Sequence, residues 1–169
     1  LDDKKFWPIF AAAESLGVPI YLHPAMPHPD AIKAYFAEYE ELQGSAWGFA
    51  VDTACHFLRI MFAGVFDAYP KLTIILGHLG EGIPFNLWRL DHRNEWMKQR
   101  HKYAAKKWVA DYMRANFWVT TSGNFATPSL VASMAELGAV RVMFSTDYPF
   151  EDIAQSVEWF DNAAISEAD

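Results

Sequence analysis

Side chains able to bind a metal ion follow three short apolar runs of this 169-residue chain. The three pairs are residues 18–22 with His23, residues 72–76 with His78, and residues 140–145 with Asp147. Imidazole and carboxylate groups are the ligands expected for a catalytic Zn²⁺ or Mn²⁺ ion with an open coordination position. If the runs are neighbouring strands of one parallel sheet, their carboxyl ends bring these groups to the same edge.

Each of these residues also has an ordinary explanation. A lone histidine at a strand end is more often a hydrogen-bonded structural residue, and Asp147 precedes Tyr-Pro, a common setting for a turn. The coincidence of three such residues favours the functional interpretation, because parallel strands about 4.8 Å apart in a curved sheet direct them to one point. The sequence therefore predicts a metal site at the ends of these strands.

Two further charged residues follow His78. Glu81 lies three residues later. It is either a carboxylate stabilised by a helix N-terminus or a partner that fixes the tautomer of His78 and raises its basicity. Arg89 lies eleven residues after His78. It is a surface residue or, if it points at the site, a residue that holds a substrate carboxylate.

Other polar residues carry weaker signals. Ser122 and Asn124 are either hydrogen-bond donors of the pocket or parts of an ordinary turn. Cys55 lies in a helical pattern with no nearby partner, which predicts core packing. Four histidines lack the strand-end position and are interpreted as structural or exposed: His28, His56, His92 and His101.

Hydrophobic periodicity predicts the elements that must position these residues. Strands are expected at residues 18–22, 72–76, 117–121 and 140–145. Helices are expected at residues 2–16, 30–42, 47–68, 84–94, 108–115, 128–137 and 153–160, with residues 95–107 as an exposed charged segment. Helices and strands in alternation predict right-handed βα units and a parallel α/β sheet. Four units make either half of an eight-stranded barrel or a small open sheet, and the 52% hydrophobic content favours the half barrel.

Composition and charge argue against several classes of protein, among them nucleic-acid-binding and membrane-spanning proteins. The net charge of −7 has no block of like charges, which argues against nucleic-acid binding. No apolar run approaches the ~20 residues of a membrane span. The single Cys55 excludes an internal disulfide and fits a reducing compartment, so we expect a cytoplasmic protein. Seven Trp and 16% aromatic residues indicate a surface that meets more protein. The first residues carry neither an initiator Met nor a signal peptide, so a fragment of a longer protein is expected.

Four motifs in this order resemble the amidohydrolase superfamily, in its aminocarboxymuconate-semialdehyde-decarboxylase-like branch: YLHP, GHLGE, TTSGN and STDYP. The neighbouring segments look closest to the γ-resorcylate (2,6-dihydroxybenzoate) decarboxylase type. The resemblance covers nearly the whole chain. It implies a distorted TIM-like (β/α)₈ barrel, of which residues 1–169 form a partial domain with about strands five to eight, the N-terminal half being absent.

The resemblance also implies roles for individual residues. His23 and Asp147 would bind one divalent metal ion, Zn²⁺ or Mn²⁺, with Asp147 also acting as acid and base. His78 with Glu81 would form the catalytic pair, and Arg89 with His78 would bind the substrate. The first-strand ligands of the family have no counterpart here, and two ligands are too few for a stable site. The visible chain is therefore expected to be inactive alone.

The activity implied is that of a carbon–carbon lyase, a carboxy-lyase that removes CO₂ from hydroxylated aromatic acids without oxidation. Aromatic residues at Trp47, Phe49, Phe125 and Tyr148 would suit a flat ring, although core packing explains them equally well. The expected partners are an aromatic carboxylate, the remainder of the barrel and further copies of the chain. Two alternatives stay open: a metal-dependent hydrolase of the same superfamily and a non-catalytic structural fragment. The first strand of the longer protein would separate them, since Glu-x-His favours the decarboxylase and His-x-His the hydrolase.

Overall fold

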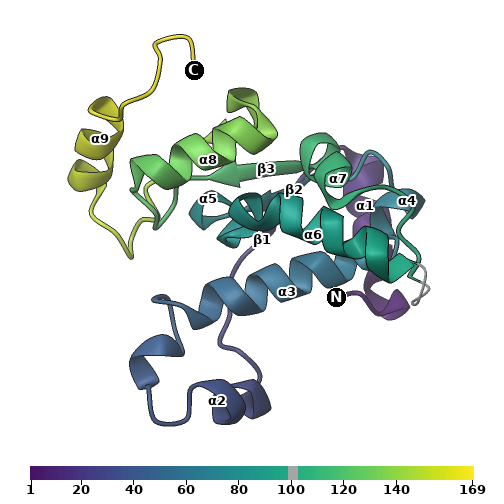
Figure 1. The fold of residues 1–169 in the computed structure, drawn as a ribbon. Helices are drawn as coiled ribbons and strands as arrows, with labels where there is room; N and C mark the ends of the chain where they lie inside the picture. The colour runs from purple at the N-terminus through teal and green to yellow at the C-terminus, as the bar shows by residue number, and fades with distance from the viewer. Residues whose placement is uncertain (99–102) are drawn as a thin grey trace.

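The computed structural model describes residues 1–98 and 103–169, and the expectation for His101 lies outside the described residues. Four parallel strands form one sheet in the order in which they occur along the chain. The strands are β1 (Ile20–Leu22), β2 (Ile74–Leu76), β3 (Phe117–Thr120) and β4 (Val142–Met143). Because each strand neighbours the next through a helical crossover, the chain advances steadily in one direction (Figure 1). The predicted α/β class and the parallel sheet are confirmed.

Helices fill every connection of the sheet (Figure 1). Before β1 lie the 3₁₀ turn η1 (Lys4–Phe6) and α1 (Trp7–Leu16). Between β1 and β2 lie α2 (Pro29–Tyr35), η2 (Glu40–Leu42), α3 (Gly48–Phe62) and α4 (Val65–Ala68). Between β2 and β3 lie α5 (His78–Glu81), α6 (Ile83–Lys98) and α7 (Val109–Asn116). The chain ends with α8 (Thr127–Leu137), η3 (Ala139–Arg141), β4 and α9 (Ile153–Asp161).

Two predicted helices differ from the structure. The helix expected over residues 47–68 is divided into α3 and α4 by Gly64, whose φ of 85° lies in the left-handed region. The helix expected over residues 30–42 stops at Tyr35, and a 3₁₀ turn follows separately. Its first turn is capped by His28, whose Nδ1 accepts the backbone N–H of Asp30 at 3.2 Å.

The remaining boundaries shift by a few residues. Helix α6 continues to Lys98, so the first part of the segment expected to be exposed and charged is helical. The strands are two to four residues long, shorter than their apolar runs. The predicted end of α1 at Gly17 is confirmed, with a left-handed φ of 64° and backbone bonds to the last turn.

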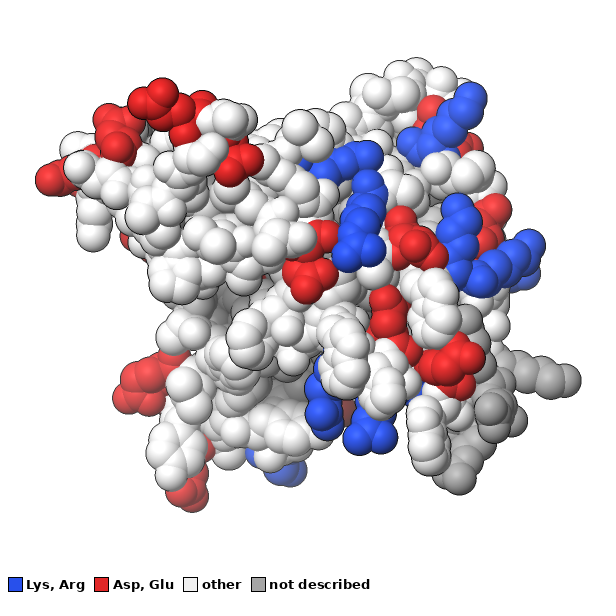
Figure 2. All heavy atoms as spheres, turned by 45° about the horizontal axis from the view of Figure 1, so that its top comes forward, with Lys and Arg blue, Asp and Glu red and all other residues white. Residues whose placement is uncertain are grey.

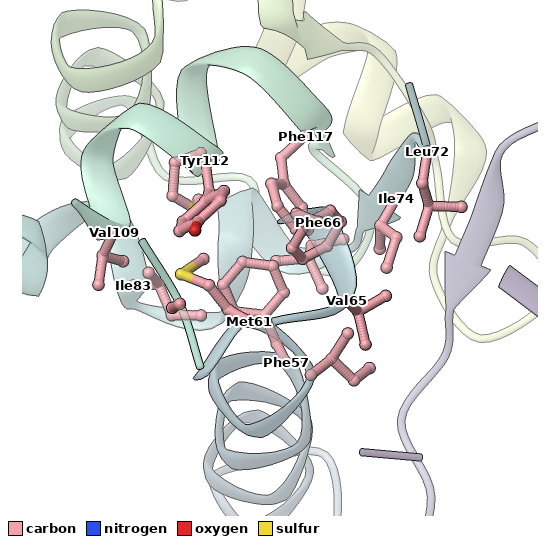
Figure 3. Packing of buried hydrophobic residues seen from close by; sticks show 14 of the residues in the cluster. Phe57, Met61, Val65, Phe66, Leu72, Ile74, Ile83, Val109, Tyr112 and Phe117 are labelled. Carbon is pink, nitrogen blue, oxygen red and sulfur yellow. The ribbon is translucent and has the colours of Figure 1, made fainter. Parts of the chain in front are cut away.

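An aromatic cluster attaches the middle of the sheet to the helices (Figure 3). Phe117 of β3 meets Phe57 of α3 edge to face at 4.3 Å between ring centroids, and Phe66 of α4 at 4.9 Å. All three side chains are fully or almost fully buried. Burying each large apolar side chain contributes about 1.5–3 kcal/mol, so this contact holds β3 firmly in place.

The opposite face of the sheet is less covered. Side chains alternate along a strand, so Tyr21 lies on the face opposite to Ile20 and Leu22, which pack on the core. Tyr21 remains 44% exposed. Among the described residues, β1 and β4 each have one strand neighbour, which leaves two sheet edges unpaired. Both features are those of a barrel that is half complete.

The molecular surface mixes charge and apolar area. On the face that Figure 2 shows, Lys and Arg side chains lie beside Asp and Glu, and broad areas carry neither. Large apolar side chains are strongly exposed on α6, among them Phe85 at 85% and Trp88 at 72%. Within residues 1–98 and 103–169, no helix has the length and apolar character needed to cross a bilayer.

Candidate active site

The predicted site residues follow the carboxyl ends of three strands. His23 comes directly after β1, His78 lies two residues after β2, and Asp147 lies four residues after β4. Because the strands are parallel and adjacent, these ends share one edge of the sheet.

His23 and Asp147 line the same hollow, which has a volume of about 420 Å³. The His23 Nδ1–H donates to the backbone oxygen of Pro24 at 2.8 Å, since a carbonyl oxygen can only accept. The Nε2 lone pair of neutral His23 is therefore free to bind a metal ion, as is usual for ligating histidines. The hollow is completed by Tyr21, Ser122, Ser145, Thr146, Tyr148 and Phe150.

His78 and Glu81 lie on a left-handed turn. The non-glycine residues His78, Leu79 and Glu81 have φ values of 51°, 56° and 55°, and Gly80 and Gly82 also have positive φ. A left-handed conformation costs an L-residue about 1–2 kcal/mol. The turn brings the His78 Nδ1 to 2.7 Å from the Glu81 Oε1. Glu81 thus contacts His78 in the way that an orienting partner requires.

The environment of His78 favours its protonated form. Its hydrogen bond to Glu81 raises the pKa of His78, and the negative charges of Glu81, Asp147 and Glu151 act in the same direction. Partial burial lowers that pKa but does not cancel the increase. His78 can therefore hold a proton beside Asp147 more readily than an ordinary histidine.

The turn after β3 separates His78 from Asp147. Gly123 has a φ of 64°, and a Cβ built on it would lie 2.7 Å from the His78 Cδ2 and 3.2 Å from the Asp147 Oδ2. The Ser122 carbonyl accepts the His78 backbone N–H at 3.1 Å, and the Asn124 side chain donates to the His78 carbonyl at 3.4 Å. Ser122 and Asn124 thus belong to an ordinary turn, which was one of the two interpretations of the sequence. From this turn they form hydrogen bonds with the backbone of His78.

Three hydroxyl groups form a cluster beneath His23 and Asp147. The Tyr21 hydroxyl lies 2.8 Å from the Thr120 Oγ1 and 3.0 Å from the Ser122 Oγ, and the last two oxygens are 2.6 Å apart. Sequence reasoning missed this cluster. The signal was period-two spacing, since Tyr21 precedes His23 by two residues and Thr120 precedes Ser122 by two.

A second cavity of about 550 Å³ is lined by His78 and by residues of α3. One wall is apolar, and the other is made by His78, Glu81, Asn86 and Asn124. The apolar lining comes from Ala46, Trp47, Phe49, Ala50, Val51, Ala54 and Leu58. Phe49 lies on α3, within the helix expected over residues 47–68. Phe125, also considered for the ring pocket, packs against Trp159 at 5.6 Å. Tyr148 lines the hollow of His23 instead.

Cys55 corrects one prediction. It is exposed, whereas core packing was expected. Only one side of α3 packs on the core, and Cys55 lies on the side that lines the 550 Å³ cavity. A helical pattern alone does not show which of these two sides a residue occupies.

Arg89 lies on α6 and is exposed. It lines neither of the two cavities, and within the described ranges no ion pair involves it. The histidines expected to be structural or exposed are found in such positions: His28 caps α2, His56 lies 3.5 Å from Asp52, and His92 stacks on Trp88. The role of Arg89 stays a prediction.

The ligand set is incomplete in the described chain. Among residues 1–98 and 103–169, no group of three or more His, Cys, Asp or Glu side chains is placed to hold a metal ion. A metal ion bound by His23 and Asp147 would thus need further ligands from outside these residues.

Comparison with known proteins defines the class. The amidohydrolase family model matches residues 1–169, and the chain belongs to this family. A γ-resorcylate decarboxylase of Polaromonas sp. (strain JS666) is 49% identical over 168 residues, which are 99% of this chain and 51% of the relative. The chain therefore spans about half the length of the curated relatives that it matches.

Solved structures agree with this family and with the fold. A dihydroxybenzoic acid decarboxylase from Polaromonas sp. JS666, with bound manganese and the inhibitor 2-nitroresorcinol, matches with a TM-score of 0.93 and 48% identity. That match covers 99% of this chain and 50% of the other. A 5-carboxyvanillate decarboxylase from Novosphingobium aromaticivorans, complexed with manganese, matches with a TM-score of 0.91 and 35% identity over 98% of this chain and 48% of the other. The chain has the fold of the C-terminal part of these barrel enzymes.

We predict that Glu81→Gln lowers the pKa of His78 in the metal-free, full-length protein, because the main cause of the raised value is removed. A raised folded-state pKa means that the pair stabilises the fold fully below the ordinary value of 6.5 and loses this effect as pH rises through the folded pKa. The difference in unfolding free energy between the wild type and the variant should therefore shrink as pH rises above 6.5. An NMR titration of the His78 ring measures the pKa, with the exposed Glu38→Gln as control. An unchanged pKa in Glu81→Gln would contradict the pairing.

A second prediction concerns Gly123. Gly123→Ala and Gly17→Ala place alanine at the same φ of 64°, but a Cβ at Gly17 has no neighbour within 4 Å. Both variants should lose about 1–2 kcal/mol of unfolding free energy through backbone strain, measured by urea denaturation of the full-length protein. Only Gly123→Ala should also displace the His78 ring and shift its NMR resonances, because its Cβ would overlap with that ring. Equal spectra for the two variants at His78 would show that Gly123 does not separate the site residues.

Proposed function

We propose that the full-length protein is a metal-dependent, non-oxidative decarboxylase of hydroxylated aromatic acids of the γ-resorcylate kind. The observation that carries this proposal is the arrangement around Gly123. It places the His78–Glu81 pair against Asp147, which shares a hollow with His23. The similarity to γ-resorcylate decarboxylases supports the choice of reaction.

The residues present fit a divalent ion. His23 offers a free Nε2, and Asp147 offers a carboxylate in the same hollow. We assign both as metal ligands, with the remaining ligands supplied by the N-terminal half of the barrel. A bound Mn²⁺ or Zn²⁺ would supply positive charge that anchors the substrate and stabilises charge developing in the ring. Imidazole with carboxylate suits both metals.

Asp147 and His78 would handle the proton. Decarboxylation requires a proton on the ring carbon that bears the carboxylate. The bond between this carbon and the carboxylate then breaks and CO₂ leaves. The electron pair of the broken bond stays with the ring and restores its aromaticity. Asp147 would deliver that proton to carbon. A carboxyl group beside a dication favours its ionised form, so Asp147 needs a proton supplied by its surroundings. His78 is placed for this task, because its hydrogen bond to Glu81 raises its pKa and it lies against Asp147 across Gly123.

The substrate contacts follow from the shape of the site. The apolar wall of α3 would pack on a flat ring, and His78 would contact its polar substituents. Arg89 is proposed to engage the substrate carboxylate or ring substituents, by resemblance to the family. The proposal includes a cytoplasmic enzyme, supported by the single Cys55, and a homo-oligomer, supported by the exposed aromatic side chains of α6.

The direct test is CO₂ release by the full-length, Mn²⁺-loaded protein from 2,6-dihydroxybenzoate and related hydroxybenzoates. We expect release by the wild type and a loss of about 10²–10⁴-fold in kcat for Asp147→Asn, which removes the acid. The exposed Asp161→Asn on α9 is the matched control and should retain wild-type rates. Ester or lactone cleavage without CO₂ from any hydroxybenzoate would instead establish the hydrolase, and full activity of Asp147→Asn would remove Asp147 from the mechanism.

A further inference from the structure

Thr121 bridges the end of β3 to the segment that carries Asp147. Strand β4 ends at Met143, so the residues that follow have no strand pairing to hold them. The Thr121 hydroxyl accepts the Ser145 backbone N–H at 2.9 Å and donates to the Ser145 carbonyl at 2.8 Å. The Thr121 backbone N–H donates to Met143 at 3.1 Å. One side chain therefore satisfies both backbone groups of Ser145, as a neighbouring strand would.

The position of Thr121 makes this bridge rigid. Thr121 is fully buried, with 0% exposure, and its hydroxyl is engaged as both donor and acceptor. A β-branched side chain has few rotamers, so the hydroxyl has little freedom to turn away. Removal of the hydroxyl would leave the part-buried N–H and carbonyl of Ser145 without this partner, which costs more than the loss of a fully exposed hydrogen bond.

Asp147 depends on this support because its own backbone is strained. It has a φ of 61°, in the left-handed region that a non-glycine residue adopts only when its surroundings impose it. After Asp147, its carbonyl accepts the N–H of Phe150 at 2.8 Å. Before Asp147, the bridge from Thr121 to Ser145 lies two residues away. The segment is thus fixed on both sides of the strained residue.

The same turn also holds His78. The carbonyl of Ser122, next to Thr121, accepts the His78 N–H, and a Cβ on Gly123 would lie within 3.2 Å of both the His78 ring and the Asp147 carboxylate. Residues 121–124 therefore connect the turn that carries His78 with the segment that carries Asp147, and Thr121 makes the contact with the second of these.

We propose that Thr121 is a positioning residue that sets the Asp147 carboxylate against His78 and the metal site through its two hydrogen bonds to Ser145. The inference rests on the proposed role of Asp147 as a metal ligand and acid. It predicts that the hydroxyl of Thr121 controls metal affinity and kcat although it touches neither metal nor substrate.

The test compares variants of the full-length protein in Mn²⁺ affinity, measured by calorimetry, and in kcat and KM for 2,6-dihydroxybenzoate. Thr121→Val keeps the shape and removes the hydroxyl, whereas Thr121→Ser keeps the hydroxyl. We expect Thr121→Val to weaken Mn²⁺ binding or kcat by about 10–100-fold, with a smaller change in KM, as for other residues that orient ligands. Thr121→Ser should restore values close to wild type.

Thr53 of α3 provides the matched control. It is buried to 2% exposure, and its hydroxyl has no hydrogen-bond partner in the described part of the chain. Thr53→Val makes the same chemical change without breaking such a bridge and should leave Mn²⁺ affinity and kcat unchanged. If Thr121→Val does not fold, Thr121→Ser and Thr121→Ala form the deciding pair, since they differ only in the hydroxyl.

Three results would overturn the proposal: a folded Thr121→Val with Mn²⁺ affinity and kcat within twofold of wild type, equal losses in the serine and alanine variants, or equal losses in Thr53→Val. Failure of the proposed function has a different signature. A wild-type protein that binds Mn²⁺ but releases no CO₂ would contradict the decarboxylase, while the Mn²⁺ affinities of the variants would still decide the role of Thr121.

Discussion

The packing of Phe117 between Phe57 and Phe66 fixes β3, and the turn after β3 carries the contacts that hold the site together. The strands are too short to place His78 and Asp147 by strand pairing alone, since both residues lie beyond the last paired position. Their placement is instead set by residues 121–124, which bind the His78 backbone on one side and Ser145 on the other. The aromatic core and the candidate site are thus connected through a single strand.

Much of the site lies on strained backbone. His78, Leu79, Glu81 and Asp147 all have positive φ, at about 1–2 kcal/mol each. Opposing contacts offset this cost: Leu79 is 3% exposed, and its carbonyl accepts the Ser133 hydroxyl at 3.0 Å. Strain of this kind persists where the surroundings determine the conformation, and it gathers at functional sites. The left-handed turn provides what a straight strand cannot, an imidazole and a carboxylate in contact three residues apart.

Local sequence patterns predicted the features that depend on local chemistry. The apolar runs predicted the four strands, and their alternation with helices predicted that the strands are parallel. The strand ends predicted the common edge on which His23, His78 and Asp147 lie. The spacing of Glu81 from His78 left two interpretations open, a carboxylate at a helix N-terminus or a partner of His78, and the structure shows a hydrogen bond between the two side chains. Gly17 ended its helix as expected.

The features that depend on contacts distant in sequence were not predicted. A glycine is tolerated inside a helical pattern, so the presence of Gly64 did not predict the break between α3 and α4. The bridge from Thr121 to Ser145 joins residues 24 positions apart, and nothing in the motif TTSGN marks its second residue as the bridging one. The direction of Arg89 depends on the packing of α6, and the described residues contain no third side chain that would complete the proposed metal site.

The proposed function requires that His23 and Asp147 bind one metal ion at the carboxyl edge of the sheet. It is tested most directly by a crystal structure of the full-length protein grown with Mn²⁺, with the ion located by its anomalous scattering. We predict one ion with the His23 Nε2 and an Asp147 carboxylate oxygen as direct ligands. An ion bound elsewhere, or bound at this edge without His23 and Asp147, would contradict the account.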